Sequence, residues 1–153
     1  MKINLTKKEY RVLVEMLYLG DWMLHAHEVE PSHKEHSELK DKIFAYSKEM
    51  AAEDIIDYSK VSNSYSETNK FGAEMYENFI KPYDGNVFWE ELLERLSERD
   101  VIKEIGFEKY HSMDGIQKGT AIDKVKERYA AEFEENELEH IKVEYKNLVK
   151  QPF

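Results

Sequence analysis

The sequence predicts an all-α fold that forms a single domain over residues 1–153, with five or six helices. Apolar residues recur at three- and four-residue steps through most of the chain, which is the spacing of one helix face. Three prolines and six glycines leave few breaks in that pattern. Two Ser/Thr-x-x-Glu capping boxes, one near each of two long apolar patterns, supply helix starts.

The first two predicted helices form a long antiparallel hairpin. Thr6 and Glu9 form a capping box ahead of a helix that we expect to run to about Glu28, before Pro31. Ser32 and Glu35 form the second box, and the helix behind it is expected to extend to about Ser59. A short connection containing proline favours antiparallel neighbours. The apolar stripes that predict these helices are Tyr10, Val12, Leu13, Met16, Leu17, Leu19, Met23 and Leu24, then Leu39, Ile43, Tyr46 and Met50.

The rest of the chain predicts a loop and further helices. Residues 59–69 are rich in Ser and Asn and are typical of a loop, and a shorter helix is expected over residues 67–80. The segment "KPYDGN" should end that helix, and another should run from about residue 87 to a stop at Gly106. After a weakly patterned stretch, Thr120 is expected to cap a last helix with Ile122, Val125, Tyr129 and Phe133 on one face.

The two ends of the chain carry an alternating pattern that favours strands. Ile3 and Leu5 alternate near the start, and Ile141, Val143 and Tyr145 alternate near the end. A short two-stranded ribbon pairing the termini is therefore one expectation, and a continued helix or a frayed tail is the alternative.

Composition and charge narrow the classes of function. The net charge of −10 makes nucleic acid a poor partner, because phosphate backbones would be repelled. No apolar run reaches the roughly 18 residues that a membrane span needs, so we expect no membrane partner. Cysteine is absent, which leaves only His and carboxylate ligands for a metal and is consistent with a cytoplasmic location.

Four of the six histidines lie in the segment "HAHEVEPSHKEH", residues 25–36. On a helix that advances about 100° per residue, His27 falls within the predicted apolar face, near ~180°, whereas His25 falls near ~340°. His36 lies at the margin of the second apolar stripe. His27 and His36 should therefore approach each other at the hairpin turn and are the candidate pair, and His25 and His33 are not expected to take part.

A pair of imidazoles predicts a metal site only if further ligands join it. Zinc, iron or manganese at His27 and His36 would need a nearby carboxylate, or His111 or His140 from elsewhere. The alternative is two histidines that bond to helix-end carbonyls or carboxylates, and on that interpretation no cofactor is expected. Glu-x-x-His pairs, the pattern of di-iron bundles, occur at Glu30–His33, Glu108–His111 and Glu137–His140, but that geometry would also need two further Glu on the facing helices.

A second surface on the first helix suggests a protein partner. Tyr18 and Trp22, with Arg11, lie opposite the predicted apolar stripe, and these residue types are enriched at binding hot spots. Either the helix is sandwiched inside the fold or this face binds a partner. We found no nucleophile, phosphate-loop or dinucleotide motif.

Three classes of function remain open. The sequence favours a non-enzymatic interaction or structural protein, with a protein partner or a homo-oligomer such as a homodimer. The first alternative is a metal-binding helical protein or metal-dependent enzyme centred on His27 and His36. The second is an acidic mimic or inhibitor of a basic partner that uses the acidic segment from Glu127 to Glu144.

Overall fold

The structure is a computed structural model that describes residues 3–27 and 33–142. Within the chain that the sequence predicted as one domain, the contacts group into two compact units, Met1–Gly85 and Asn86–Phe153. Each unit has its own hydrophobic core. None of the helices in the described ranges is both long enough and apolar enough to cross a bilayer.

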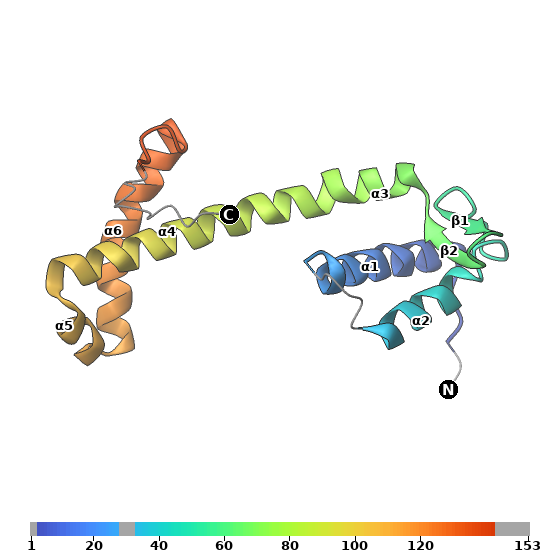
Figure 1. Cartoon of the computed structure of the whole chain (residues 1–153), viewed down its shortest axis with the longest axis horizontal. Coiled ribbons are helices and arrows are strands. Elements are labelled where there is room, and N and C mark those ends of the chain that lie inside the picture. Colours follow the sequence, from blue (N-terminus) through green and yellow to red (C-terminus); the bar gives the residue numbers. More distant parts are fainter. Residues whose placement is uncertain (1–2, 28–32, 143–153) are drawn as a thin grey trace, which may run out of the picture. The chain divides into compact units, whose positions relative to one another are not determined.

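Helices dominate the described residues, as predicted, and a short antiparallel ribbon accompanies them (Figure 1). In chain order the elements are α1 (Lys7–His25), α2 (Lys34–Phe44), β1 (Ile56–Ser59), β2 (Ser64–Glu67), α3 (Asn69–Met75), the π-helix η1 (Tyr76–Ile80), α4 (Lys81–Ile105), α5 (Phe107–Ser112) and α6 (Gly115–Asn136).

The start of α1 is confirmed in detail. The Thr6 hydroxyl accepts a hydrogen bond from the Glu9 backbone N–H at 3.2 Å, and the Glu9 carboxylate accepts one from the Thr6 N–H at 2.8 Å. These reciprocal bonds satisfy two donors that a helix start leaves unpaired. The helix ends at His25, a little before the predicted Glu28.

The second helix is much shorter than predicted. It ends at Phe44, and the chain then turns through residues 45–55, with Ala51 at a positive φ of 51°. Phe44 is completely buried, whereas Leu39 and Tyr46, which the periodicity placed on one face with Ile43, are about half exposed. The predicted stripe therefore combined residues from a helix with residues from the turn after it.

The β-ribbon replaces the end of the second predicted helix, which was expected to reach about Ser59, and most of the loop predicted over residues 59–69. Residues 56–59 pair antiparallel with residues 64–67, with Tyr58 opposite Tyr65. The two rings lie 4.9 Å apart, and the Tyr58 hydroxyl donates to Asn63 Oδ1 at 2.6 Å across the turn. Asn63 adopts a φ of 51°, a conformation that Asn tolerates better than most residues. The hairpin, which its tyrosine pair stabilises, could therefore not be recognised from the serine-rich composition.

The ribbon that was predicted to join the termini is not found in the described residues. Residues 3–5 and 141–142 are not in strands, and Val143 and Tyr145 lie outside the described ranges. The antiparallel ribbon lies instead in the middle of the first unit.

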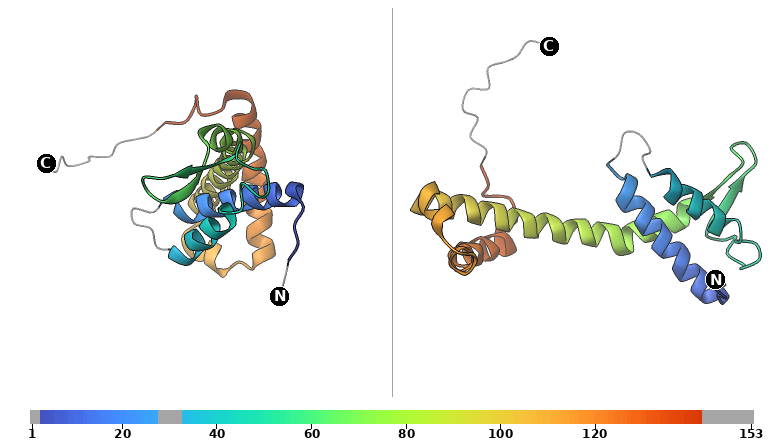
Figure 2. Two further views of the ribbon diagram at one scale, coloured as in Figure 1. Left: turned by 90° about the vertical axis from the view of Figure 1, so that its right-hand side faces the viewer. Right: turned by 90° about the horizontal axis from the view of Figure 1, so that it is seen from below.

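The core of the first unit is formed by α1, α2, the ribbon and α3. In Figures 1 and 2, α1 and α2 lie beside each other, and α2 also contacts β2. Thr68 begins α3 by accepting a hydrogen bond from the Phe71 N–H at 3.3 Å. The buried side chains of this core are Tyr10, Val14, Phe44, Ala52, Ile55, Ile56, Phe71 and Met75.

The helical path continues through Pro82, where the sequence predicted a stop. A proline inside a helix lacks an N–H and crowds the carbonyl four residues earlier. Here the π-helical turn η1 comes immediately before, and the Lys81 N–H bonds to the Tyr76 carbonyl five residues back. A hydrogen bond that spans five residues shifts the hydrogen-bonding register immediately before the proline. The helix that was predicted to end here therefore continues, with a local change of helix type.

The second unit is built from the later part of α4 with α5 and α6. Gly106, at φ 88°, ends α4 as predicted, in the left-handed conformation that glycine favours. Asp114 and Gln117 form the capping box of α6, so this helix starts before the predicted cap at Thr120. The predicted face is confirmed, since Ile122, Val125 and Phe133 are buried. The core of this unit is Val101, Tyr110, Ile122 and Val125.

Candidate functional site

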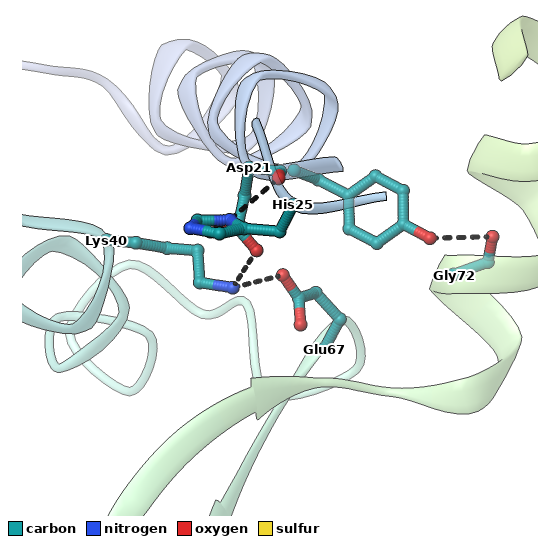
Figure 3. A network of polar contacts seen from close by, with 6 residues as sticks. Asp21, His25, Lys40, Glu67 and Gly72 are labelled. Atoms are coloured by element: carbon teal, nitrogen blue, oxygen red, sulfur yellow. Dashed lines mark hydrogen bonds and ion pairs between the residues drawn. The ribbon is translucent and has the colours of Figure 1, made fainter. Parts of the chain in front are cut away.

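The ammonium of Lys40, on α2, is paired with two carboxylates in the first unit. Its Nζ lies 2.7 Å from Asp21 Oδ2 on α1 and 3.2 Å from Glu67 Oε1 at the end of β2 (Figure 3). The Lys40 side chain is only 15% exposed, and its Nζ also lies 5.6 Å from the centre of the Phe44 ring. One cation thus links three elements that are distant in sequence.

The balance of forces on Lys40 favours its charged form. Burial by itself would lower the pKa of this lysine, because removal from water penalises a charge. The hydrogen bond to Asp21 and the attraction of Glu67 and Asp21 act in the opposite direction, and the net effect is a raised pKa. Lys40 is therefore a permanent cation at neutral pH and binds the two carboxylates together.

His25 lies beside this network and is held through one ring nitrogen. Its Nδ1 lies 2.9 Å from the Asp21 backbone carbonyl and 3.2 Å from Asp21 Oδ1. A carbonyl oxygen can only accept, so Nδ1 carries the proton and Nε2 of the neutral ring presents a lone pair. Nε2 is shielded from solvent and has no hydrogen-bond partner. Figure 3 shows the His25 ring beside Asp21 and Lys40.

The structure brings together a different set of histidines from the pair that helix angles predicted. The His33 ring centre lies 5.8 Å from that of His25 and 5.4 Å from that of His36. His27 lies in the turn after α1 and is exposed, as is His36 on α2. Within residues 3–27 and 33–142, no group of three or more His, Asp or Glu side chains is already positioned to hold a metal ion.

The faces of α1 explain why the angular prediction missed His25. Val14 and Tyr10 are completely or almost completely buried, whereas Val12, Met16 and Met23 are 46%, 65% and 59% exposed. The predicted stripe had averaged two separate apolar faces. The true core face is rotated by roughly 90° from that average, towards the side that carries His25. This rotation places His25 next to the core and away from open solvent.

The exposed residues of α1 form a continuous apolar strip along the helix. Val12, Met16, Leu19 and Met23 follow a four-three-four spacing, and we call these four residues the α1 strip. Leu19 is partly buried at the edge of the first core, and the other three are more open. Gly20 lies beside the strip, and a Cβ added there would meet no atom within 4 Å.

The residues that the sequence proposed for a partner surface contact their own chain in part. The Tyr18 ring packs edge-on against Phe71 at 5.7 Å, and its hydroxyl lies 3.4 Å from the Gly72 carbonyl. Arg11 forms an ion pair with Asp54 and donates to the Ala51 carbonyl at 2.9 Å. On this side α1 is therefore partly covered by its own chain, at Tyr18 and Arg11.

Trp22 is partly exposed and borders a small hollow of about 250 Å³ next to the Lys40 network. A larger, mostly apolar groove of about 600 Å³ lies elsewhere on the same unit. The groove is lined by Ile3, Asn4, Leu5, Tyr10, Leu13, Ile43, Tyr46, Glu49 and Met50.

The second unit contains a compact polar cluster around Asp100 on α4. This carboxylate accepts hydrogen bonds from Arg99 Nε at 2.7 Å and from the Tyr129 hydroxyl on α6. Hydrogen bonds from Arg99 and Tyr129 hold the pKa of Asp100 well below its usual range, and burial raises the pKa of Tyr129. The cluster joins α4 to α6 and has the character of a structural clamp, because each group in it is paired.

Sequence reasoning missed Asp21, Lys40 and Glu67. Asp21 and His25 are four residues apart and therefore share a helix face, which was a usable signal. Lys40 and Glu67 could not have been recognised, because lysine and glutamate on helical or loop segments are ordinarily solvent-exposed.

Comparison with protein-family models, with curated proteins and with solved structures gives no match to this chain.

Proposed function

We propose that this protein is a non-enzymatic interaction protein that self-associates through the α1 strip. The observation that supports the proposal is the exposure of Val12, Met16 and Met23 on a helix whose other face is already buried. Three open apolar side chains in register along one helix are the arrangement that a second helix can cover.

The spacing and composition of the strip suit a second copy of the same chain. A four-three-four repeat is the seam of a two-helix coiled coil, in which each apolar residue packs between residues of the facing helix. An antiparallel copy would place Val12 near Met23 of its partner and Met16 near Leu19. Two methionines give an adaptable surface that can pack against itself.

Gly20 is consistent with this arrangement. Glycine inside a helix costs roughly 0.5–1 kcal/mol relative to alanine, and no atom of the first unit needs the space. A partner helix that approaches closely beside the strip would benefit from the missing Cβ. The stability that Gly20 costs the isolated chain would therefore be offset by closer helix packing in the proposed dimer.

The experiment measures the molar mass of the full chain by sedimentation equilibrium between about 1 and 200 μM, a range that covers micromolar affinities. We expect a reversible dimer that Val12→Glu and Met16→Glu each convert to monomer, because a charge on the seam loses its water on pairing. Val61→Glu is the matched control, since Val61 is fully exposed in the ribbon turn and lies outside the strip.

Two results would contradict the proposal. Wild-type protein that remains monomeric over the whole range has no homodimer. A dimer that survives Val12→Glu and Met16→Glu uses another surface. If Trp22→Ala then weakens that dimer, the surface is the one that the sequence predicted with Tyr18, Trp22 and Arg11.

A further inference from the structure

We infer that His25, His33 and His36 form a binding site for one divalent transition-metal ion of the kind that imidazole prefers, with zinc as the probe. The inference is independent of the self-association proposed above. It differs from the sequence-based pair, because it replaces His27 by His25 and His33.

The first support is the spacing of the three rings. Two imidazoles bound to one tetrahedral zinc at about 2.0–2.1 Å have ring centres roughly 5 Å apart. The His25–His33 and His33–His36 distances of 5.8 and 5.4 Å are close to that value. The rings are steeply inclined to each other, at 63° and 86°, and are not stacked in parallel. The two distances suit an ion shared with His33, and the rings would have to turn for their nitrogens to converge on it.

The second support is the state of His25 itself. A histidine that ligates a metal through one nitrogen characteristically donates from the other to a carbonyl or carboxylate, which fixes the ring and its tautomer. His25 already makes both such contacts through Nδ1, to the Asp21 carbonyl and to Asp21 Oδ1. Its Nε2 presents a lone pair that is shielded from water and has no partner. A buried polar atom without a partner is costly, and a metal ion would satisfy it.

Asp21 is in turn held by Lys40, so the support for His25 extends through the core-facing network (Figure 3). His36 is exposed, and exposed side chains change rotamer on the ps–ns timescale. The site would therefore combine His25, whose ring is fixed, with His36, whose exposed ring can turn towards the ion. As the side chains stand, the described residues contain no ready group of three ligands, so this turning is a necessary part of the inference.

Neutral imidazoles favour zinc, copper or nickel over manganese, which prefers oxygen ligands. Three histidines and a water molecule would complete a four-coordinate zinc site.

The test is calorimetric titration of zinc chloride into the full, tag-free chain in chelator-free buffer at pH 7.5. We expect one equivalent of zinc per chain. His33→Ala, His36→Ala and His25→Ala should each weaken binding by at least about tenfold, since losing even a supporting group typically costs that much. Cobalt absorption in the visible range gives an independent readout of a tetrahedral site.

Two matched controls make the test specific. His27→Ala removes a neighbouring histidine that lies outside the three-ring group. His111→Ala removes a histidine whose Nδ1 bonds to the Phe107 carbonyl at 3.1 Å, the same local arrangement as His25 but in the second unit. Both variants should bind zinc like the wild type.

Three outcomes would overturn the inference. One is the absence of saturable zinc binding. Another is binding that His33→Ala and His36→Ala leave unchanged. The third is binding that is lost in His27→Ala but kept in His25→Ala and His33→Ala, which would restore the sequence-based pair. Circular dichroism establishes that each variant is folded, and if His25→Ala unfolds, His33→Ala and His36→Ala decide.

Discussion

At the scale of single residues, Lys40 joins two acidic side chains of the first unit. Its ammonium neutralises two carboxylates, Asp21 and Glu67, whose side chains are mostly shielded from water. Removing one member of such a group leaves the others charged and unpaired, which costs more than the group contributes when intact.

We therefore predict that Lys40→Met lowers the free energy of unfolding by about 1–3 kcal/mol. Urea denaturation followed by circular dichroism measures the change. Lys34→Met is the matched control on the same helix, because the ion pair of Lys34 with Glu38 is exposed and its loss should cost little. Equal effects of the two variants would show that the Lys40 network has no special role.

Asp100 gives a residue-scale prediction with a defined pH dependence. Its folded-state pKa lies below the ordinary value of 3.8, chiefly because Arg99 and Tyr129 hydrogen-bond to the carboxylate. As the pH falls, the unfolded chain therefore binds this proton first. The stabilising contribution of Asp100 is complete above the unfolded pKa and is lost as the pH falls through the lower folded value.

Asp100→Asn should accordingly cost about 1 kcal/mol at pH 7, with the difference from wild type shrinking below pH 4. Parallel urea titrations at pH 7, 4 and 2.5 test this expectation. Asp123→Asn serves as the control, since Asp123 is an exposed carboxylate on α6. A difference that stays constant across these pH values would rule out the linkage argued for Asp100.

At the scale of elements, the start of α1 could be predicted from the sequence and its buried face could not. The capping box was correct because it depends only on residues three apart. The core face was misplaced because α1 carries apolar residues on two sides, and hydropathy does not say which of them the rest of the chain will cover. Val14, which the predicted stripe omitted, is completely buried, whereas Met16 is mostly exposed.

The helix ends also differ in whether residue type alone determines them or whether the surrounding structure does. Gly106 was predicted correctly because its left-handed backbone follows from residue type. Pro82 was misread because the adjacent π-turn accommodates it, and nothing in the local sequence announces that turn. Among the candidate site residues, the clustering of histidines was visible in the sequence, but the choice of His25 over His27 depended on how α1 is rotated.

Gly20 allows the two roles of α1 to be separated. In the isolated chain Gly20→Ala should stabilise α1 by roughly 0.5–1 kcal/mol, because the new methyl group meets no atom and the unfolded chain loses freedom. In the proposed dimer the same methyl group would obstruct close approach of the partner helix.

We therefore expect Gly20→Ala to raise the unfolding free energy in the monomeric Val12→Glu background and to weaken the dimer in the wild-type background. Gly119→Ala is the matched control, since Gly119 is also helical and open but lies on α6. It should stabilise the chain without changing its association. A Gly20→Ala variant that tightens the dimer would contradict close approach at this position.

At the scale of the whole molecule, the net charge of −10 decides how association should respond to salt. Two copies of an acidic chain repel each other over distances of about a Debye length, roughly 30 Å at 0.01 M salt and 8 Å at 0.15 M. An apolar seam such as the α1 strip has to overcome that repulsion. Added salt screens the repulsion and leaves apolar burial largely unaffected.

Salt should have the opposite effect on binding if the chain works as an acidic mimic through the segment from Glu127 to Glu144. Part of that segment lies outside the described residues. Attraction to a basic partner would then supply much of the binding, and salt would weaken it. The direction of the salt effect thus distinguishes the proposed self-association from binding to a basic partner.

We predict that the dimer dissociation constant falls as sodium chloride is raised from 20 to 300 mM at pH 7.5, which sedimentation equilibrium can measure. Near the isoelectric point of about 5.1 the same salt series should have little effect, because the repulsion has vanished. The pH 5 series therefore serves as the internal control. A dimer that weakens steadily with salt at pH 7.5 is held by charge pairs and not by the α1 strip.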